Sequence, residues 1–370
     1  MKILHTADWH IGKRLNRKSL IEDQIYVLDQ ILEYIDQEDI DVVVIAGDLY
    51  DKKQPSQEAM NVVDHYLKEI NLVRKKPLLL ISGNHDSKPY VDARSEWFKA
   101  NDFHVNTTLE DSFTPITIQD TDFYLLPYLE IPEVRTYFND DSIDTFEKAY
   151  KKVIDEMSSK FNNENNILVG HLFVSGSKES DSEEKMTIGL TEEVPHTIFK
   201  DFDYTLLGHL HRHNAFNSNH IFYSGAIMKY SFDEMNHKKG FKVIDTDTNT
   251  VDFIEVKLLH DLIHFKGSFT DIITRKKEIE DKDAYIKFEL TDMEGYKEPM
   301  TALKQLYENT LVLSRKVESY VDEDIQYDVN NTSDDEILTL FFEKFTGRQP
   351  TDFELDTFNN HLRGINNETN

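Results

Sequence analysis

The chain has 370 residues, a formal net charge of -28 and no cysteine. It is long enough for one large core with smaller units attached. The lack of cysteine excludes disulfides, thiolate catalysis and sulfur-rich metal sites. Because the first apolar run starts at Ile3 and no run is long enough to cross a bilayer, we expect no signal peptide, no membrane span and a cytoplasmic location.

The acidic charge is distributed unevenly along the chain. Residues 1–100 contain 14 Lys and Arg against 17 Asp and Glu, so this part carries only -3 of the total charge. Contacts with phosphate groups need Lys and Arg. Lys13 and Arg14 are therefore candidate contacts for a polyanion, although a solvated loop surface explains them about equally well.

A strand, a helix and a second strand open the chain. The first strand is followed by Asp8 and His10. Apolar residues at helical spacing predict an amphipathic helix over 20–37, and the β-branched run at 42–46 predicts a buried parallel strand. This strand breaks at a glycine, and Asp48 follows it. Ligands bind at the carboxyl ends of strands in open α/β sheets, so Asp48 is placed to hold a cation, although alone such a residue more often caps a turn.

The next part of the chain repeats this arrangement. A helix opens at Pro55, and the strand predicted over 78–81 is followed by Asn84 and His85. Beyond these residues we expect a short helix over 92–100, one or two strands within 114–126 with a turn near Asp120, and a helix over 142–161.

Two later strands end in histidine. The run from Ile167 to Gly170 precedes His171, and the run over 205–208 precedes His209 and His211. Between them lies a polar stretch, 175–186, which we interpret as a surface loop beside the site. Further strands are expected over 221–224, 241–245 and 251–256, the last two forming a hairpin.

Five apolar runs thus end in oxygen or imidazole groups, which chance turns do not explain. The seven predicted metal ligands are Asp8, His10, Asp48, Asn84, His171, His209 and His211. Seven are too many for one ion with an open position, so we predict two ions about 3.5–4 Å apart. Asp48 is the expected bridge, because its strand lies between the other ligand strands in the chain order of a doubly wound sheet. Such ligands suit Mn²⁺, Fe²⁺, Zn²⁺ or Mg²⁺, and several imidazoles disfavour Mg²⁺.

Two ions of this kind activate water and stabilise charge on phosphorus, so the predicted reaction is phosphoester hydrolysis. His85 is the candidate general acid for the leaving oxygen. Asp86 either orients His85 or closes the turn. Of the remaining histidines, His5 is expected to be a buried strand residue. His213 is the best candidate for an additional ligand, but the seven predicted ligands already complete the site.

The character of the sequence changes near residue 265. We predict a catalytic domain over 1–265, a smaller α+β domain over 266–320, an acidic linker over 321–335 and two apolar helices over 336–370. Two short apolar helices cannot bury their apolar faces alone, so they dock on this chain or on a partner.

Taken together, the ligand motifs resemble those of the calcineurin-like metallophosphoesterases over residues 1–257. These motifs are Asp8-x-His10, Gly47-Asp48-x-x-Asp51, Gly83-Asn84-His85-Asp86, Gly170-His171 and Gly208-His209-x-His211. Within that superfamily the chain is similar to the SbcD-type nuclease subunits of SbcCD complexes, in the stretches 5–12, 47–51, 175–189 and 208–211 and in its small second domain and terminal helices. The expected fold is α/β: a metallophosphoesterase β-sandwich flanked by helices, with a small capping domain and C-terminal helices.

The resemblance implies a metal-dependent DNA nuclease in DNA repair, recombination and replication. It implies Asp8, His10, Asp48 and His211 around one Mn²⁺, Asp48, Asn84, His171 and His209 around the other, and His85 as the acid. The implied activities are 3′–5′ exonuclease on duplex ends and endonuclease on single strands and hairpins, with Lys13 and Arg14 as candidate DNA contacts. The implied partners are DNA, an SbcC-type coiled-coil ATPase that takes the terminal helices, and a second copy of the chain within a heterotetramer.

Two departures from related proteins bear on the substrate. Asp51 stands where archaeal and eukaryotic relatives tend to have His. Lys52 and Lys53 follow it, whereas protein phosphatases of the superfamily carry Arg-Gly, which argues against a phosphoprotein substrate. Two alternatives stay open: a stand-alone phosphodiesterase for a small nucleotide, and a non-catalytic scaffold on the same fold.

Overall fold

The computed structural model describes residues 1–92, 101–180, 182–183, 192–316, 334–346 and 348–359. The chain divides into two compact units, residues 1–316 and 317–370, and each is described by itself. Among the described residues, no helix is both long enough and apolar enough to cross a membrane.

The first sheet carries the N-terminal strands. Its six strands are, in order, β15 (Thr250–Glu255), β14 (Gly240–Asp245), β1 (Lys2–Thr6), β4 (Val42–Ala46), β5 (Leu78–Ile81) and β6 (Phe103–Asn106). β1, β4, β5 and β6 are parallel, and the predicted hairpin β14–β15 adds to β1 in the antiparallel sense. Every residue of β4 is buried, because both faces of the sheet are covered, and this explains its unbroken apolar run.

The second sheet has five strands. They are, in order, β13 (Ile221–Tyr223), β12 (Tyr204–Gly208), β9 (Asn165–His171), β8 (Thr121–Leu126) and β7 (Ile116–Ile118). The predicted turn near Asp120 joins β7 to β8, with Gln119 in the left-handed region at φ 56°. The other pairs are parallel, so the carboxyl ends of β9 and β12 lie at the same edge.

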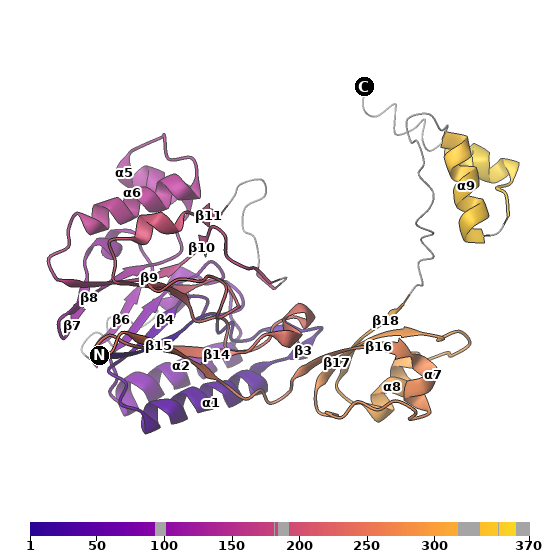
Figure 1. The fold of residues 1–370 in the computed structure, drawn as a ribbon, viewed down its shortest axis with the longest axis horizontal. Helices are drawn as coiled ribbons and strands as arrows, with labels where there is room; N and C mark the ends of the chain where they lie inside the picture. The colour runs from indigo at the N-terminus through magenta and orange to yellow at the C-terminus, as the bar shows by residue number, and fades with distance from the viewer. Residues whose placement is uncertain (93–100, 181, 184–191, 317–333, 347, 360–370) are drawn as a thin grey trace. The chain divides into compact units, whose positions relative to one another are not determined.

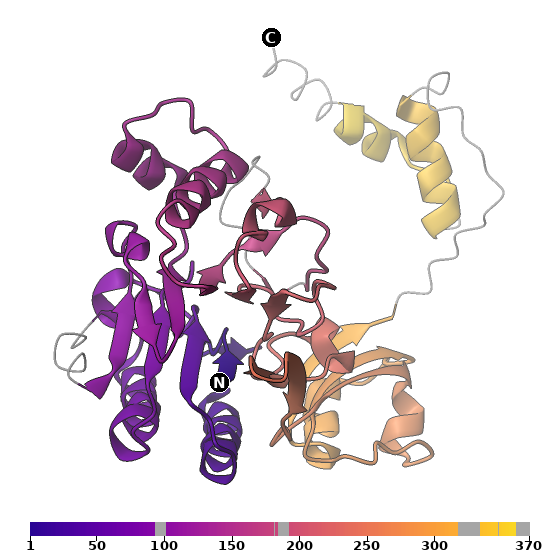
Figure 2. The same ribbon diagram turned by 60° about the vertical axis from the view of Figure 1, so that its left-hand side comes forward.

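The two sheets pack face to face between two layers of helices, as the ribbon views show (Figures 1 and 2). The core between the sheets joins side chains such as Val44 and Ile81 to Val169 and Leu206. The helices α1 (Ile21–Gln37) and α2 (Gln57–Lys68) cover the outer face of the first sheet, and α5 (Ile131–Phe138) and α6 (Phe146–Ser158) cover that of the second. This arrangement confirms the predicted β-sandwich flanked by helices.

Short elements complete the first unit. They are β2 (Arg14–Leu15), β3 (Lys18–Ser19), α3 (Lys88–Val91), β10 (Phe173–Val174), β11 (Glu193–Val194), a π-helical turn over Glu69–Val73 and 3-10 turns over Glu110–Phe113, His196–Phe199 and Phe232–Asn236. β10 and β11 pair with each other across the polar loop predicted from residue 175.

Three details differ from the sequence-based expectations. The chain-order argument for Asp48 assumed a single doubly wound sheet, which is wrong, because β9 and β12 belong to the second sheet. The helix expected over 142–161 is shorter, α6, and α5 before it was not predicted. Most of the helix expected over 92–100 lies outside the described residues.

A small domain follows the sandwich. Its three parallel strands are β16 (Leu262–Ser268), β17 (Tyr285–Thr291) and β18 (Thr310–Arg315), with α7 (Phe269–Ile273) and α8 (Pro299–Leu306). It has a core of its own around Phe269 and Phe288. Asp23 of α1 is buried against it, accepting hydrogen bonds from the Tyr285 hydroxyl at 2.8 Å and from His260 Nδ1 at 2.7 Å.

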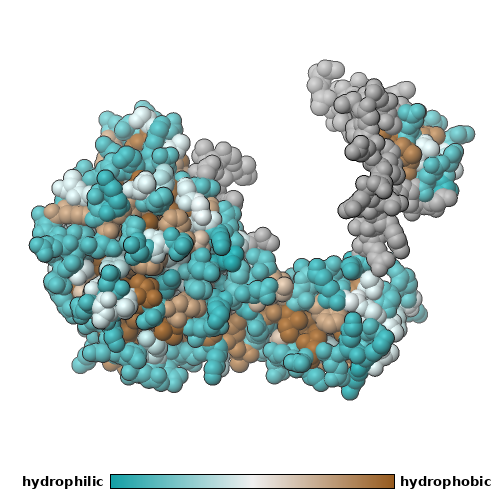
Figure 3. Space-filling view, in the orientation of Figure 1, coloured by the Kyte–Doolittle hydropathy of each residue, from teal (hydrophilic) through white to brown (hydrophobic). Residues whose placement is uncertain are grey.

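The second unit contains α9 (Asp334–Thr346) and a helical stretch over 352–359. Ile337, Phe341 and Phe353 are exposed by 43%, 54% and 79% within this unit. The face of the protein in Figure 3 is mostly hydrophilic, with several hydrophobic areas. The predicted linker, 321–335, falls almost entirely outside the described residues.

Candidate metal centre

The seven predicted ligands come together at one edge of the sandwich. The first sheet contributes Asp8 and His10 after β1, Asp48 after β4 and Asn84 after β5, and the second sheet contributes His171 at the end of β9 and His209 and His211 after β12. All seven are buried, none more than 8% exposed. The carboxyl ends of strands from both sheets therefore face one another across this edge.

Four of these residues form one group. The Nε2 atoms of His10 and His211 lie 3.2 Å apart, and His10 Nε2 lies 3.6 Å from Asp48 Oδ2. Asp8, His10 and His211 each offer one ligand atom within 4.8 Å of the others. These donor atoms lie close enough together to hold one metal ion.

A second group also includes Asp48, and Asp8 lies within reach of it, since Asp8, Asp48 and His171 each offer one ligand atom within 4.8 Å of the others. His171 Nε2 is 2.9 Å from Asn84 Oδ1 and 3.3 Å from Asp48 Oδ2. His209 Nδ1 is 3.1 Å from the same amide oxygen. Asp48 therefore belongs to both groups.

The residues present fit a pair of cations. Asp8 and Asp48 are buried carboxylates at 0% and 2% exposure, and neither has a Lys or Arg ion-pair partner within the described chain. Asp48 has only His10 and His171 beside it as ion-pair partners, and a bound cation would offset the cost of burying both carboxylates. The mixed oxygen and imidazole donor set, without sulfur, is suited to divalent metal ions.

The backbone around the site is strained in a way that aims the ligands. Asp8, His10, Asp48 and His209 have φ values of 52°, 43°, 51° and 94°, in the left-handed region that residues other than glycine rarely adopt. Such strain persists only where the surroundings enforce it, and it gathers at functional sites. Gly83 lies against Asp48, and a Cβ at this position would collide with the carboxylate.

Burial and charge shift the pKa values of these groups strongly. Burial lowers the pKa of His209 to about 3. Burial also disfavours the charged form of His171, but the neighbouring Asp48 outweighs it and raises the pKa to about 9. Burial alone would raise the pKa of Asp48, but the positive charge of His171 outweighs burial and holds this pKa well below its usual range. Asp48 and His171 therefore stabilise each other's charged forms.

His85 lies against the first group: His10, Asp48 and His85 each offer one ligand atom within 4.8 Å of the others. Its backbone N–H donates to Asp48 Oδ1 at 2.9 Å, and its Nδ1 lies 3.2 Å from the carbonyl oxygen of Asp51. Its ring is half-buried and meets the His10 ring edge-on, with centroids 4.7 Å apart. The ring is therefore held at the rim of the ligand cluster.

Asp86 closes the turn. Its carboxylate accepts hydrogen bonds from the backbone N–H groups of Gly83, Leu49 and Tyr50 at 2.9, 3.1 and 3.0 Å. Of the two roles predicted for Asp86, orienting His85 or closing the turn, the structure shows the closing of the turn. Burial raises the pKa of Asp86 to about 6. The residue ties the loop after β4 to the loop after β5.

Four other predicted residues lie around the site. Lys13 is half-buried and pairs with Asp51 at 2.8 Å, whereas Arg14 is exposed. His5 is fully buried, as predicted. His213 stacks on Phe253 with ring centroids 3.7 Å apart, and among the described residues it belongs to none of the candidate metal-binding groups.

Sequence reasoning missed a layer of polar residues behind His211. Ser182, Glu183, Glu234 and Lys239 all contact this histidine. Glu234 lies in the 3-10 turn before β14 and is fully buried. They are 23 to 29 positions from it in the chain. Ser182 and Glu183 fall in the stretch 175–189 that carries the family resemblance, which gave them no role, and Glu234 and Lys239 fall in no motif.

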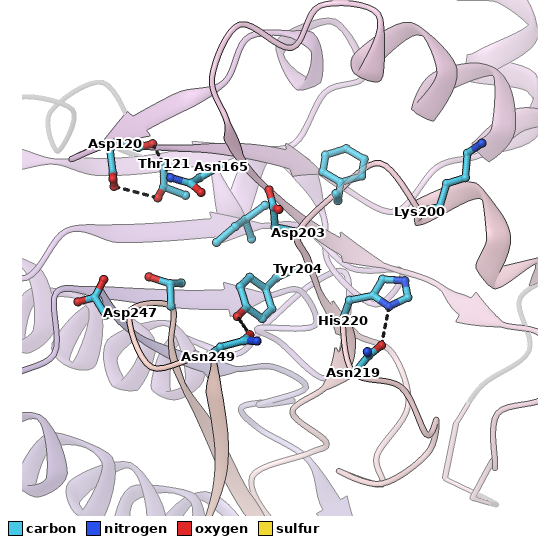
Figure 4. A pocket seen from close by; sticks show the side chains of 13 residues that line it. Asp120, Thr121, Asn165, Lys200, Asp203, Tyr204, Asn219, His220, Asp247 and Asn249 are labelled. Carbon is cyan, nitrogen blue, oxygen red and sulfur yellow. Dashed lines mark hydrogen bonds between the residues drawn. The ribbon is translucent and has the colours of Figure 1, made fainter.

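A separate cavity of about 560 Å³ lies at the opposite, amino ends of β9 and β12 (Figure 4). Its lining includes Asp203, Tyr204, His220 and Asn249, with the Tyr204 hydroxyl bonded to Asn249. None of the seven predicted ligands lines it. The cavity is therefore distinct from the candidate metal centre.

Comparison with known proteins agrees with this architecture. Residues 1–213 match the family model described as calcineurin-like phosphoesterase. The chain belongs to the calcineurin-like phosphoesterase family. Residues 258–346 match a second model, described as type 5 capsule protein repressor C-terminal domain. The family predicted from the motifs is thereby confirmed.

One relative matches over nearly the whole chain. It is a protein of Staphylococcus epidermidis (strain ATCC 12228 / FDA PCI 1200) described as the SbcD subunit of the nuclease SbcCD, 38% identical over 369 residues, which are 99% of each chain. This match confirms the predicted resemblance of this family member to SbcD-type subunits.

Solved structures match more weakly. TT1561 of Thermus thermophilus is 11% identical, covers 69% of this chain and 99% of its own, and has a TM-score of 0.40. Yfce, a phosphoesterase from E. coli, is 14% identical, with coverages of 69% and 93% and a TM-score of 0.31. The family assignment depends on the sequence matches.

Proposed function

We propose that this family member is the nuclease subunit of an ATP-dependent complex and hydrolyses DNA phosphodiester bonds. The observation that carries the proposal is the pair of ligand groups that share Asp48 at the sandwich edge. The full-length similarity to an SbcCD subunit supports DNA as the substrate and an SbcC-type coiled-coil ATPase as the partner. The proposed activities are 3′–5′ cleavage of duplex ends and endonuclease cleavage of single strands and hairpins.

The proposed ligand assignment follows the two groups. Asp8, His10, Asp48 and His211 would hold one Mn²⁺, and Asp48, Asn84, His171 and His209 would hold the other. Two such ions supply an activated water and stabilise the charge that develops on the transferred phosphoryl group. Imidazole-rich sites of this kind favour Mn²⁺ over Mg²⁺, since Mg²⁺ prefers oxygen ligands and retains its waters.

His85 is the proposed general acid. The contact between its Nδ1 and the Asp51 carbonyl oxygen orients the ring and leaves Nε2 as the atom that reaches the substrate. A protonated Nε2 there would donate to the oxygen that leaves the phosphorus. Proton donation at this position is a task that ions holding the phosphate do not perform.

DNA contacts are proposed at the loop after β1. Arg14 is exposed and its side chain donates to the Arg17 carbonyl oxygen, so its charge faces solvent. Lys13 is paired with Asp51, which reduces the charge it offers to a phosphate. With a net charge of -28, the chain offers little positive surface, so the ATPase partner would supply much of the surface that attracts DNA.

The exposed apolar residues of α9 are the proposed docking surface for the ATPase. Exposed apolar residues gathered on one helix are typical of partner-binding surfaces. A homodimer within a heterotetramer completes the proposed assembly.

A nuclease assay tests the proposal. The wild-type protein is incubated with Mn²⁺ and end-labelled duplex and hairpin DNA, with and without the ATPase and ATP, and Asp48→Asn serves as the inactive control. We expect Mn²⁺-dependent cleavage that Asp48→Asn lacks. Hydrolysis of bis-p-nitrophenyl phosphate without cleavage of any DNA, even with the ATPase present, would instead favour the small-nucleotide alternative.

A further inference from the structure

The side of His211 that faces away from the ligand cluster is held by a buried polar network. His211 Nδ1 lies 2.7 Å from Ser182 Oγ and 3.4 Å from Glu234 Oε1. The Ser182 hydroxyl also donates to Glu234 Oε1. Ser182 therefore stands between the imidazole and the carboxylate.

Glu234 is a charged residue in the interior. Its side chain is fully buried, and its Oε2 forms an ion pair with Lys239, which is 2% exposed. A carboxylate paired with an ammonium group is an acceptor only, and a serine hydroxyl has one proton to give. Since Ser182 gives that proton to Glu234, its oxygen accepts from His211, and His211 Nδ1 is the donor.

The direction of these bonds fixes the tautomer of His211. A neutral imidazole carries one N–H, so protonation at Nδ1 leaves Nε2 with a free lone pair. It is Nε2 that faces His10 Nε2 at 3.2 Å inside the cluster. The network therefore presents the atom that a metal ion needs, in the form that binds metal.

The same network holds the backbone of His211. Lys239 Nζ donates to the His211 carbonyl oxygen at 2.8 Å, and the His211 N–H donates to Glu183 Oε1 at 2.6 Å. Hydrogen bonds from this network thus hold both the side chain and the main chain of His211. This leaves little freedom for the ring to turn its Nε2 away from the cluster.

We propose that Glu234 is a positioning residue for the candidate metal ligand His211, acting through Ser182 to keep the proton on Nδ1 and Nε2 open to the ion. This inference rests on the proposed metal centre and goes beyond it, because it assigns roles to two residues outside the ligand motifs. Partners that orient metal-binding histidines commonly raise metal affinity about 10–100-fold.

The wild-type protein provides a first test, in which a variant serves only to assign the signals. In metal-free protein labelled with ¹⁵N-histidine, the two ring nitrogens of His211 are observed by NMR and assigned by their loss in His211→Gln. We expect the proton on Nδ1. A proton on Nε2 would overturn the proposal, because the network would then block the atom meant for the metal.

Two variants test the effect on metal. Glu234→Gln and Ser182→Ala are compared with Ser180→Ala, a control in the same loop whose hydroxyl has no hydrogen-bond partner in the described chain. By calorimetric titration with Mn²⁺, without DNA, we expect both variants to weaken one of two binding events by about 10–100-fold and the control to leave both unchanged. The melting temperature of the metal-free protein reports any loss of stability that is purely structural. Ser182→Ala should cause little such loss, because it removes only one oxygen atom.

Failures of the two proposals are distinguishable. If the wild-type protein binds no Mn²⁺ and cleaves no DNA, the proposed metal centre fails. If the wild-type binds two Mn²⁺ and cleaves DNA, but Ser182→Ala and Glu234→Gln bind Mn²⁺ equally well, only the role assigned to Glu234 is overturned.

Discussion

The Nε2 atoms of His10 and His211 face each other at 3.2 Å, although 201 positions separate the two residues in the chain. Without a metal ion this distance fits a hydrogen bond from one Nε2–H to the other ring nitrogen, whereas a cation bound by both rings needs both lone pairs free. The pairing joins the end of β1 in the first sheet to the end of β12 in the second. The ligand cluster therefore depends on how the two sheets pack.

Asp48→Asn should disrupt both ligand groups at once. The amide keeps the shape but loses the negative charge that both ions would share, and metal ions contribute several kcal/mol of charge stabilisation. We expect fewer than two Mn²⁺ per chain by elemental mass spectrometry and a loss of DNA cleavage of about 10²–10⁴-fold. Asp51→Asn is the matched control for metal content, and an unchanged count of two ions in Asp48→Asn would contradict the shared role.

His85→Ala should separate metal binding from cleavage. His85 contacts Asp48 through its backbone N–H, which the substitution keeps, so we expect both ions to remain bound. Loss of a general acid typically costs about 10²–10⁴-fold in rate. Cleavage of a substrate with a good leaving group, such as a p-nitrophenyl ester, should suffer less than cleavage of DNA. Loss of metal from this variant would show that the assigned role is wrong.

Removal of residues 336–370 should leave cleavage of simple DNA substrates intact and abolish binding to the ATPase. The ligand residues all lie in the unit 1–316, whereas the exposed Phe341 and Phe353 lie in the other. Co-purification of tagged full-length and truncated chains with the ATPase measures the loss. Retention of the ATPase by the truncated chain would refute the docking surface.

Lys242→Met should stabilise the protein at neutral pH. Lys242 Nζ lies 5.4 Å from the centre of the Phe222 ring, and burial lowers the pKa of this lysine from 10.5 to about 8. Below pH 8 the folded protein bears the full cost of a buried ammonium group. As pH rises from 8 to 10.5 the unfolded chain binds more protons than the folded one, so the wild-type gains stability and the cost disappears.

We therefore expect Lys242→Met to raise the free energy of unfolding by about 1 kcal/mol at pH 7, after a discount for partial exposure, and the gain to vanish by about pH 10.5. Urea unfolding at several pH values measures it. The exposed Lys200→Met is the control, and a gain that does not fall between pH 8 and 10.5 would contradict the explanation.

Much of the site was predictable because each ligand sits at a recognisable strand end. The pattern of a buried run, a glycine and a polar residue recurs for Asp48, Asn84, His171 and His209. The carboxyl ends of parallel strands lie at the same edge of a sheet, so the local pattern alone predicts that the candidate ligands lie in the same region. The burial of His5 and the hairpin β14–β15 followed from alternation and turn residues in the same way.

The sequence by itself determined which side chains could bind metal and which family the chain belongs to. Only the tertiary structure decided that the ligands come from two packed sheets and that Asp86 accepts hydrogen bonds from Leu49 and Tyr50. It also decided that Lys13 pairs with Asp51 and that Glu234 and Ser182 lie behind His211. These contacts join residues far apart in the chain through packing between layers. Local periodicity and motif spacing carry no information about which residues such packing brings together.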